Sequence, residues 1–407
     1  MAQLFDRNKL SEAIATISNE EIEPFLEIVR KWHADLHHGT LLQDKETSRE
    51  QAYNQDFFVR ILGYEEKPAQ PYSLEPKATT EAQNYPDVVL GYFDGPTRNV
   101  SAVVELKGAS VSLDRPQKRE SNLTPVQQGF KYKVQYRSCP FVVVSNFQEF
   151  RIYNDNQLDY NSWTLDDLVD PAHDYFGFKS WFYLMHSSQL TAKAGEAVTE
   201  RLLTDIRIEQ EAIGEDLYAR YAEARQSLIN AIIQDNPAYA SNPQSAITFA
   251  QTIIDRIVFI AFAEDRGLLP SDTLMRVKIE SERSSIGLSF WDNLKVLFKG
   301  IDSGTSALGI PNGYNGGLFK ANPELDALLI SDSALAPLIQ LSEFDYSHDS
   351  SVTILGKIFE QSVSDIEQLK STVEVSGSSH IPRVTRRKKR AFSTHPTTLS
   401  AIWSTKP

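Results

Sequence analysis

Three charged residues in one short stretch have types and spacing that could support catalysis. The stretch is "YPDVVLGYFDGPTRNVSAVVELKGA", residues 85 to 109, and it contains Asp87, Glu105 and Lys107 among valines and leucines. Its pattern predicts two strands joined by a turn at "DGPTRN". Since side chains alternate along a strand, Glu105 and Lys107 are expected on one face and their apolar neighbours on the other. We therefore expect the apolar side chains to face the core and the charged pair to face a cleft.

The same hairpin predicts a metal site. The turn lets the chain double back, so the Asp87 carboxylate can lie beside that of Glu105. Two nearby carboxylates repel each other unless a cation holds them, and Mg²⁺ accepts few protein carboxylates while keeping waters for chemistry. Such an ion polarises a phosphoryl oxygen and lowers the pKa of a bound water, and Lys107 could orient that water or offset charge in the transition state. An E-x-K triplet alone is a common exposed strand face, but Pro86 and Asp87 at hairpin distance favour phosphodiester hydrolysis.

Hydrophobic periodicity indicates which elements position these residues. Apolar spacing from 8 to 36 and from 48 to 64 predicts amphipathic helices. Short β runs follow between 85 and 153, with one helical stretch, "TPVQQGFKYKVQYR" at 124 to 137, between the second and third runs. This order predicts an α/β unit built on the hairpin.

The C-terminal half is predicted to be mostly helical. Long periodic stretches lie at 199 to 234 and 244 to 267, and "AKAGEA" at 192 to 197 is typical of a boundary. The predicted divisions are an α/β domain at 1–190, a helical domain at 191–370, and a basic linker with a disordered C-terminal tail at 371–407.

Charge and cysteine content limit the class of protein. A net charge of −13 over 407 residues argues against nucleic-acid binding through the overall field. Two local stretches are basic, from Glu105 to Arg137 and "RVTRRKKR" at 383 to 390; each is either a nucleic-acid contact or a solvated surface, and in a nuclease the basic residues from Arg115 to Arg137 would be phosphate contacts. The single cysteine, Cys139, excludes an internal disulfide and a thiolate zinc cluster. Without a signal segment or membrane span in the sequence, we expect a cytoplasmic protein that does not bind membranes.

A histidine cluster at the end of the first helical region has two interpretations. In "HADLHH", His33 and His37 share a helical face, which could suggest a metal site, and His38 follows directly. No cysteine or further ligand is near in sequence, so the pattern favours a surface cluster.

The hairpin resembles the PD-(D/E)XK nuclease superfamily, with "PD" at 86 and 87 and "ELK" at 105 to 107. Gln128 and Tyr132 lie four residues apart on the following helix, and such nucleases often place a glutamine and a tyrosine there. A plain helix-surface contact is the alternative for that pair. The resemblance also implies Glu50, in the upstream helix, as an additional acidic residue, although the sequence does not fix which way that helix points.

A larger set of segments resembles the N-terminal part of the bifunctional type IIG restriction-modification enzymes. These segments occur in the family's order between about Glu50 and Glu367: "FFVRILGY", "TPVQQGFKY", "VVVSNFQEFRIY", "RIVFIAFAEDRGLLP", "YNGGLF" and "ILGKIFEQS". The resemblance implies a PD-(D/E)XK domain, with a central mixed sheet flanked by helices, followed by a mainly α-helical connector. In the family, an adenine-specific N6 DNA methyltransferase that uses S-adenosylmethionine and a target-recognition domain come next.

The methyltransferase signatures of that family are not found in this sequence. No F-x-G-x-G loop is present, so S-adenosylmethionine is not expected to bind, and "NPAY" at 236 to 239 is interpreted as a helix-ending turn. We hypothesise that a frameshift near Arg390 truncated a longer enzyme, because another reading frame of "AFSTHPTTLSAIWSTKP" can encode a sequence like the methyltransferase start. The final seventeen residues are then not expected to pack.

The sequence thus predicts a Mg²⁺-dependent DNA endonuclease portion of a type IIG enzyme acting on double-stranded DNA. Asp87 and Glu105 would bind the metal, Lys107 would assist the reaction, and Gln128, Tyr132 and Glu50 would support the site. One alternative is a fragment best described by the adenine-specific methyltransferase activity of the intact enzyme. Another is a non-catalytic DNA-binding or scaffolding remnant that works with a separate methyltransferase or specificity polypeptide. The oligomeric state stays open.

Overall fold

The structure, a computed structural model, describes most of the chain in two compact units. The described residues are 3–44, 46–77, 85–118, 122–283, 287–310, 312–314, 316–344, 346 and 350–376. The units are Met1–Glu209 and Gln210–Pro407. Their division runs through the long helix α9 (Val198–Asp235), whereas the predicted domain boundary at 190/191 lies ahead of that helix. Each unit is considered by itself below.

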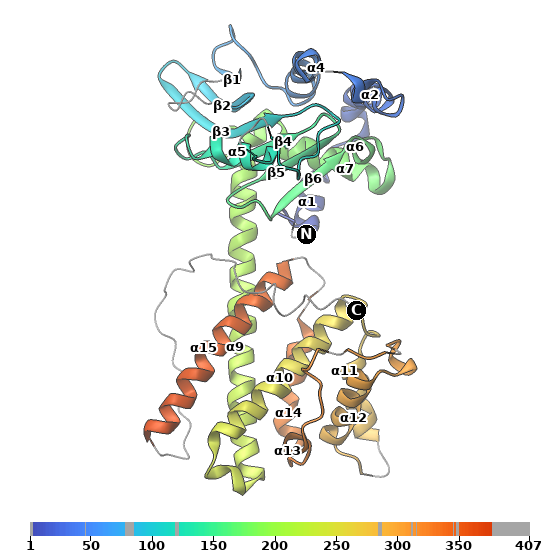
Figure 1. The fold of residues 1–407 in the computed structure, drawn as a ribbon, viewed down its shortest axis with the longest axis vertical. Coiled ribbons are helices and arrows are strands. Elements are labelled where there is room, and N and C mark those ends of the chain that lie inside the picture. The colour runs from blue at the N-terminus through green and yellow to red at the C-terminus, as the bar shows by residue number, and fades with distance from the viewer. Residues whose placement is uncertain are drawn as a thin grey trace. The chain divides into compact units, whose positions relative to one another are not determined.

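The first unit is built on one six-stranded sheet (Figure 1). The strands lie in chain order, β1-β2-β3-β4-β5-β6; β3 and β4 are parallel and the other neighbouring pairs are antiparallel. A parallel pair needs a crossover connection, and the helix between β3 and β4 supplies it. The strands are β1 (Tyr72–Pro76), β2 (Val88–Asp94), β3 (Thr97–Leu106), β4 (Phe141–Ser145), β5 (Glu149–Tyr153) and β6 (Tyr160–Thr164).

Helices cover both faces of this sheet. The largest core of the unit joins one face to the N-terminal helices and to α7, and a second core joins the other face to α5. The predicted central mixed sheet flanked by helices is therefore confirmed. The helices of this unit are α1 (Arg7–Ile14), α2 (Asn19–His37), α3 (Thr40–Gln43), α4 (Glu46–Tyr53), the π-helix η1 (Asn54–Ile61), α5 (Pro125–Lys133), α6 (Leu165–Val169), α7 (Ala172–Met185) and α8 (Ser187–Leu190).

The predicted hairpin is β2 and β3. Its turn places Gly95 at a φ of +55°, a conformation that glycine adopts without the steric cost of a Cβ. Along β3, Val104 lies in the core beneath the N-terminal helices, while Val103 lies in the core beneath α5. This alternation fixes the face of every later residue of the strand, so Glu105 is on the α5 side.

The second unit is helical around one large apolar core. Its most apolar helix, α10 (Pro243–Asp265), has the length and composition of a membrane span, but 67% of its most apolar window is buried inside the fold, as in a core helix. Besides the C-terminal part of α9, the elements are η2 (Pro237–Ala240), α10, α11 (Thr273–Arg283), α12 (Phe290–Ser303), η3 (Ser306–Leu308), α13 (Pro323–Asp326), α14 (Asp332–Ile339), η4 (Gln340–Glu343) and α15 (Ser350–Ser376). The predicted helical C-terminal region is therefore confirmed.

The predicted basic tail lies mostly outside the described residues. Helix α15 continues through 371–376, where the sequence analysis placed the start of a linker. Residues 377–407, which include the basic run and the segment attributed to a frameshift, lie outside the described part of the chain. The "NPAY" segment at 236 to 239 forms the start of the short helix η2 directly after α9, so it is a turn at a helix end.

Candidate functional site

Asp87 and Glu105 occupy facing positions on adjacent strands. The β2–β3 ladder pairs Val88 with Val104, so continuing the register by one residue puts Asp87 opposite Glu105. The backbone N–H of Leu106 donates a hydrogen bond to Asp87 Oδ2 at 2.8 Å, which ties the carboxylate to β3. Cross-strand neighbours of this kind have Cβ atoms about 4.5–5.5 Å apart. The structure therefore brings together the two acids that the sequence predicted as metal ligands.

Lys107 lies on the same face as Glu105. Its Nζ forms an ion pair with Glu105 Oε1, which shows that the two side chains run together past the end of β3. Both are buried, with Glu105 only 3% exposed and Lys107 only 9% exposed, while Asp87 is half-buried. The expectation that the charged pair faces a cleft is therefore wrong. In the structure this pair lies under covering residues, and Asp87 is the more accessible acid.

Neighbouring backbone groups fix the position of Lys107. Its N–H donates to the carbonyl of Ser145 at 2.8 Å, at the end of the parallel strand β4. Ser145 is itself completely buried, and its hydroxyl forms a 2.7 Å hydrogen bond with the hydroxyl of Tyr53, the last residue of α4. Hydrogen bonds therefore connect Lys107 to β4, and β4 to α4, the helix that carries Glu50.

Glu50 is linked to the hairpin through a lysine that the sequence analysis missed. Glu50, on α4, is 9% exposed, and its Oε2 forms an ion pair of 3.1 Å with Lys77 Nζ. The backbone N–H of the same Lys77 donates to the carbonyl of Asp87 at 2.6 Å. Lys77 thus connects the upstream acid to the metal-ligand candidate. It follows β1, a strand not predicted from sequence, so no pattern pointed to it.

The two candidate residues on α5 have different environments. Gln128 is buried, and its Nε2 donates to Gln117 Oε1 at 3.3 Å and to the carbonyl of Leu123 at 3.4 Å. Its amide therefore holds the loop that leads into α5. Tyr132 is half-buried and packs against the core between α5 and the sheet. Both residues support the covering layer over Glu105.

Gly129 sets how closely α5 approaches the charged pair. A Cβ at this position would lie 2.6 Å from Val142 Cγ1 and 3.9 Å from Glu105 Cβ. A separation of 2.6 Å is far shorter than a carbon–carbon contact, so any side chain here must push α5 or Val142 aside. The glycine therefore lets the helix backbone lie directly on β4 and beside Glu105.

Gly129→Ala is expected to destabilise the first unit by about 1–2 kcal/mol, because the overpacking cost exceeds the gain in helix propensity. Urea unfolding of the first unit measures the change. In a Val142→Ala background, which removes the opposing methyl, the same substitution is expected to be neutral or stabilising. An equal effect in both backgrounds would show that the close approach is unimportant.

The basic residues around α5 do not all remain available for phosphate. Lys133 Nζ donates to the carbonyl of Pro140 at 2.8 Å and to that of Asn154, so this lysine ties α5 to neighbouring loops. Its predicted role as a phosphate contact is therefore not supported by its partners. The side chains that are exposed are those of Arg115, Lys118, Lys131 and Arg137; Arg119 lies outside the described residues.

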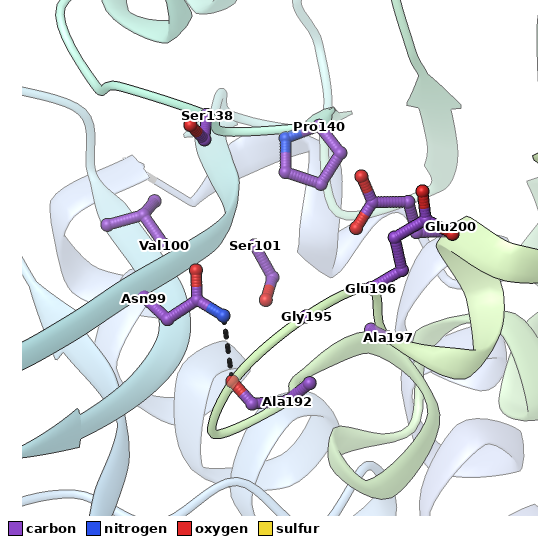
Figure 2. Close-up of a pocket in the computed structure, with 10 residues that line it drawn as sticks. All are labelled: Asn99, Val100, Ser101, Ser138, Pro140, Ala192, Gly195, Glu196, Ala197 and Glu200. Atoms are coloured by element: carbon purple, nitrogen blue, oxygen red, sulfur yellow. Dashed lines mark hydrogen bonds between the residues drawn. The ribbon is translucent and has the colours of Figure 1, made fainter.

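A cavity of about 240 Å³ elsewhere in the first unit is separate from this charged cluster. Figure 2 shows that it lies between Asn99, at the start of β3, and the segment entering α9, where Asn99 Nδ2 donates to the carbonyl of Ala192 at 2.9 Å. Burial and the adjacent Glu196 raise the pKa of Glu200, which also lines it. Asn99 and Glu105 are six residues apart along β3, so at about 3.3 Å per residue their Cα atoms are roughly 20 Å apart. None of the predicted site residues lines the cavity.

The first unit is thus a mixed α/β domain with two facing acids and a lysine at the end of its central hairpin, and a helical unit follows it. Residues 22–203 match the family described as "MmeI, N-terminal domain", and the match contains all six strands and the whole charged cluster. This region is therefore similar to the N-terminal domain of MmeI, a type IIG restriction-modification enzyme, in agreement with its sequence segments. Searches of curated proteins and of solved structures found no match.

Proposed function

We propose that the first unit is a Mg²⁺-dependent DNA endonuclease domain of PD-(D/E)XK type. The observation that carries the proposal is the facing pair Asp87 and Glu105, with Lys107 next along the same face of β3. The family supplies the setting, since restriction-modification enzymes act on DNA. The central mixed sheet flanked by helices is also the architecture that this nuclease type implies.

The charges of the cluster fit a divalent cation. Asp87, Glu105 and Glu50 contribute three carboxylates, while Lys107 and Lys77 contribute two ammonium groups, so one negative charge remains. Hard carboxylate oxygens are the ligands that Mg²⁺ takes, and a site with few protein ligands leaves room for water and phosphate oxygens. Asp87 and Glu105 would hold the ion. When bound, it would supply charge neutralisation for the phosphodiester oxygens.

The protein groups around the acids would orient the reactants. The Lys107 backbone N–H donates to the Ser145 carbonyl and its ammonium group pairs with Glu105, so this group would be positioned before substrate arrives. From there it would donate to an attacking water or to a phosphate oxygen whose charge grows in the transition state. Gln128 and Tyr132 would keep α5 over the pair, and the exposed Arg115, Lys118, Lys131 and Arg137 would contact DNA phosphates without base readout.

Cleavage of supercoiled plasmid by the purified chain tests this function. We expect nicking of unmethylated plasmid with Mg²⁺ and none with EDTA, because without the cation the two carboxylates repel the negatively charged phosphate. DNA binding should weaken steeply with salt, since lysine and arginine contacts release counterions. Retained, salt-sensitive binding without any Mg²⁺-dependent nicking would instead support the non-catalytic DNA-binding remnant.

A further inference from the structure

We propose that His33, His37 and Asp166 form a binding site for a transition-metal ion of the Zn²⁺ class, outside the nuclease site. The two histidines lie one turn apart near the C-terminal end of α2, and Asp166 lies in the first turn of α6, which packs against α2 (Figure 1). The sequence favoured a surface cluster because no further ligand was nearby. The fold supplies that ligand from a distant part of the chain.

The three ligand atoms converge on one another. His33 Nε2 lies 2.8 Å and His37 Nε2 lies 3.1 Å from Asp166 Oδ1, and the two Nε2 atoms are 3.0 Å apart. Ligand atoms that share a Zn²⁺ ion with bonds of 2.0–2.1 Å are about 3.0–3.4 Å from one another, depending on geometry. The observed triangle is therefore close to the size that a metal ion would need, and small side-chain rotations would open it fully.

The chemistry of the donors selects the metal. Imidazole suits Zn²⁺, Ni²⁺ and Cu²⁺, whereas Mg²⁺ takes oxygen ligands, so this site and the Asp87–Glu105 pair would prefer different ions. Without a metal, the hydrogen bond between the two Nε2 atoms needs a proton on one of them and a lone pair on the other. A metal ion would instead accept the lone pairs of both.

The exposure of the site predicts its behaviour. The side chain of His33 is 26% exposed, while those of His37 and Asp166 are 58% and 66% exposed. Three protein ligands at an open surface leave at least one position for water, so the ion should exchange readily. By joining α2 to α6 the ion would stabilise the helical layer that covers one face of the sheet, because a ligand that binds only the folded state stabilises it.

Zn²⁺ titration of the full chain, purified without a histidine tag and stripped of metal, tests the proposal. Excess Mg²⁺ is included so that the added Zn²⁺ does not bind at the Asp87–Glu105 pair. We expect one equivalent of Zn²⁺ by calorimetry, a rise in Tm and, with Co²⁺, visible absorption typical of nitrogen and oxygen ligands. His37→Gln and Asp166→Asn, both on exposed side chains, should each weaken binding at least about 10-fold, since even outer partners of metal ligands affect affinity that much.

His38→Gln is the matched control, because His38 neighbours the cluster but contributes no ligand atom to it. It should leave the affinity and the Tm shift unchanged. Absence of a Zn²⁺ equivalent in the unaltered chain, or equal binding by the His37→Gln variant, would overturn the proposal. Plasmid nicking by these variants should stay as in the unaltered chain, so the outcome is independent of whether the nuclease proposal holds.

Discussion

Replacing Glu105 by glutamine is expected to lower the rate of Mg²⁺-dependent plasmid nicking by at least about 10²-fold. A neutral amide is a weak ligand for a hard divalent cation, so the ion would be lost or misplaced and the phosphate charge would go unmatched. Asp87→Asn should have a comparable effect, since the two acids face each other across the β2–β3 pair. Initial nicking rates over a range of Mg²⁺ concentrations provide the measurement.

A control variant in the same hairpin distinguishes the loss of a metal ligand from the loss of a nearby negative charge. Asp94 lies at the opposite end of β2, is exposed and is paired with Thr97 beside the turn. Asp94→Asn removes the same charge from the same hairpin and should leave the nicking rate unchanged. If it slows nicking as much as Asp87→Asn does, the reaction depends on the overall charge of the hairpin and the assigned metal ligands are wrong.

Stability and catalysis must be distinguished, because Glu105 and Lys107 form a buried ion pair. Removing one partner leaves the other charge buried and costs roughly 3–5 kcal/mol, whereas removing both can be nearly neutral. The double variant Glu105→Gln, Lys107→Met is therefore expected to unfold close to the unaltered Tm and yet to remain inactive. A stable double variant that still nicks DNA would contradict the catalytic role of the pair.

The hairpin could be predicted because its physical signals are local. Alternation put Val104 and Glu105 on opposite faces, and the "DGPTRN" turn fixed how the strands meet. Both expectations agree with the register of the ladder. The burial of the charged pair could not be predicted, since it depends on Gly129 letting α5 lie close to Glu105, a contact between residues far apart in sequence.

Strands β1 and β6 and the π-helix η1 were not predicted from the sequence, for different reasons. Strands β1 and β6 are short and largely polar, and as the two outer strands of the sheet they have only one neighbour each, so they lack the apolar run that marks a central strand. The segment 54–61 is a π-helix, with the N–H of Leu62 bonded to the carbonyl of Phe57. Its apolar residues fit α-helical spacing equally well, so side-chain pattern alone could not reveal the wider turn.

Site residues outside the hairpin were predicted less completely. Glu50 was implied by resemblance, but only the fold shows its ion pair with Lys77. Asp166 carries no sequence signal that connects it to His33 and His37, because the contact depends on how α6 packs on α2. In both cases the missing partner comes from a part of the chain whose position tertiary packing decides.

In the helical unit, Asp365→Ala is expected to destabilise the fold by about 3–5 kcal/mol. Asp365, on α15, accepts a hydrogen bond from Tyr218 and forms an ion pair of 3.3 Å with Arg225 on α9. The Arg225 side chain is only 3% exposed, and it also donates to Ser362 Oγ at 2.8 Å. Without Asp365 the buried guanidinium loses its ion-pair partner, which is the costly way to break such a pair.

Arg225→Met should cost less than Asp365→Ala, because it removes the buried charge itself and leaves an apolar side chain of similar length. Burial lowers the pKa of Arg225, but an arginine stays charged, so loss of its proton cannot relieve the single Asp365 variant. In the double variant, the loss should be smaller than the sum of the two single losses. Thermal unfolding, with hydrogen exchange of α15 amides as a local probe, measures each step.

Asp216→Ala, which breaks an exposed ion pair with Arg220 on the same helix, should cost less than about 1 kcal/mol. Equal losses for Asp216→Ala and Asp365→Ala would mean that burial of the Arg225 charge contributes nothing to holding α15 on α9.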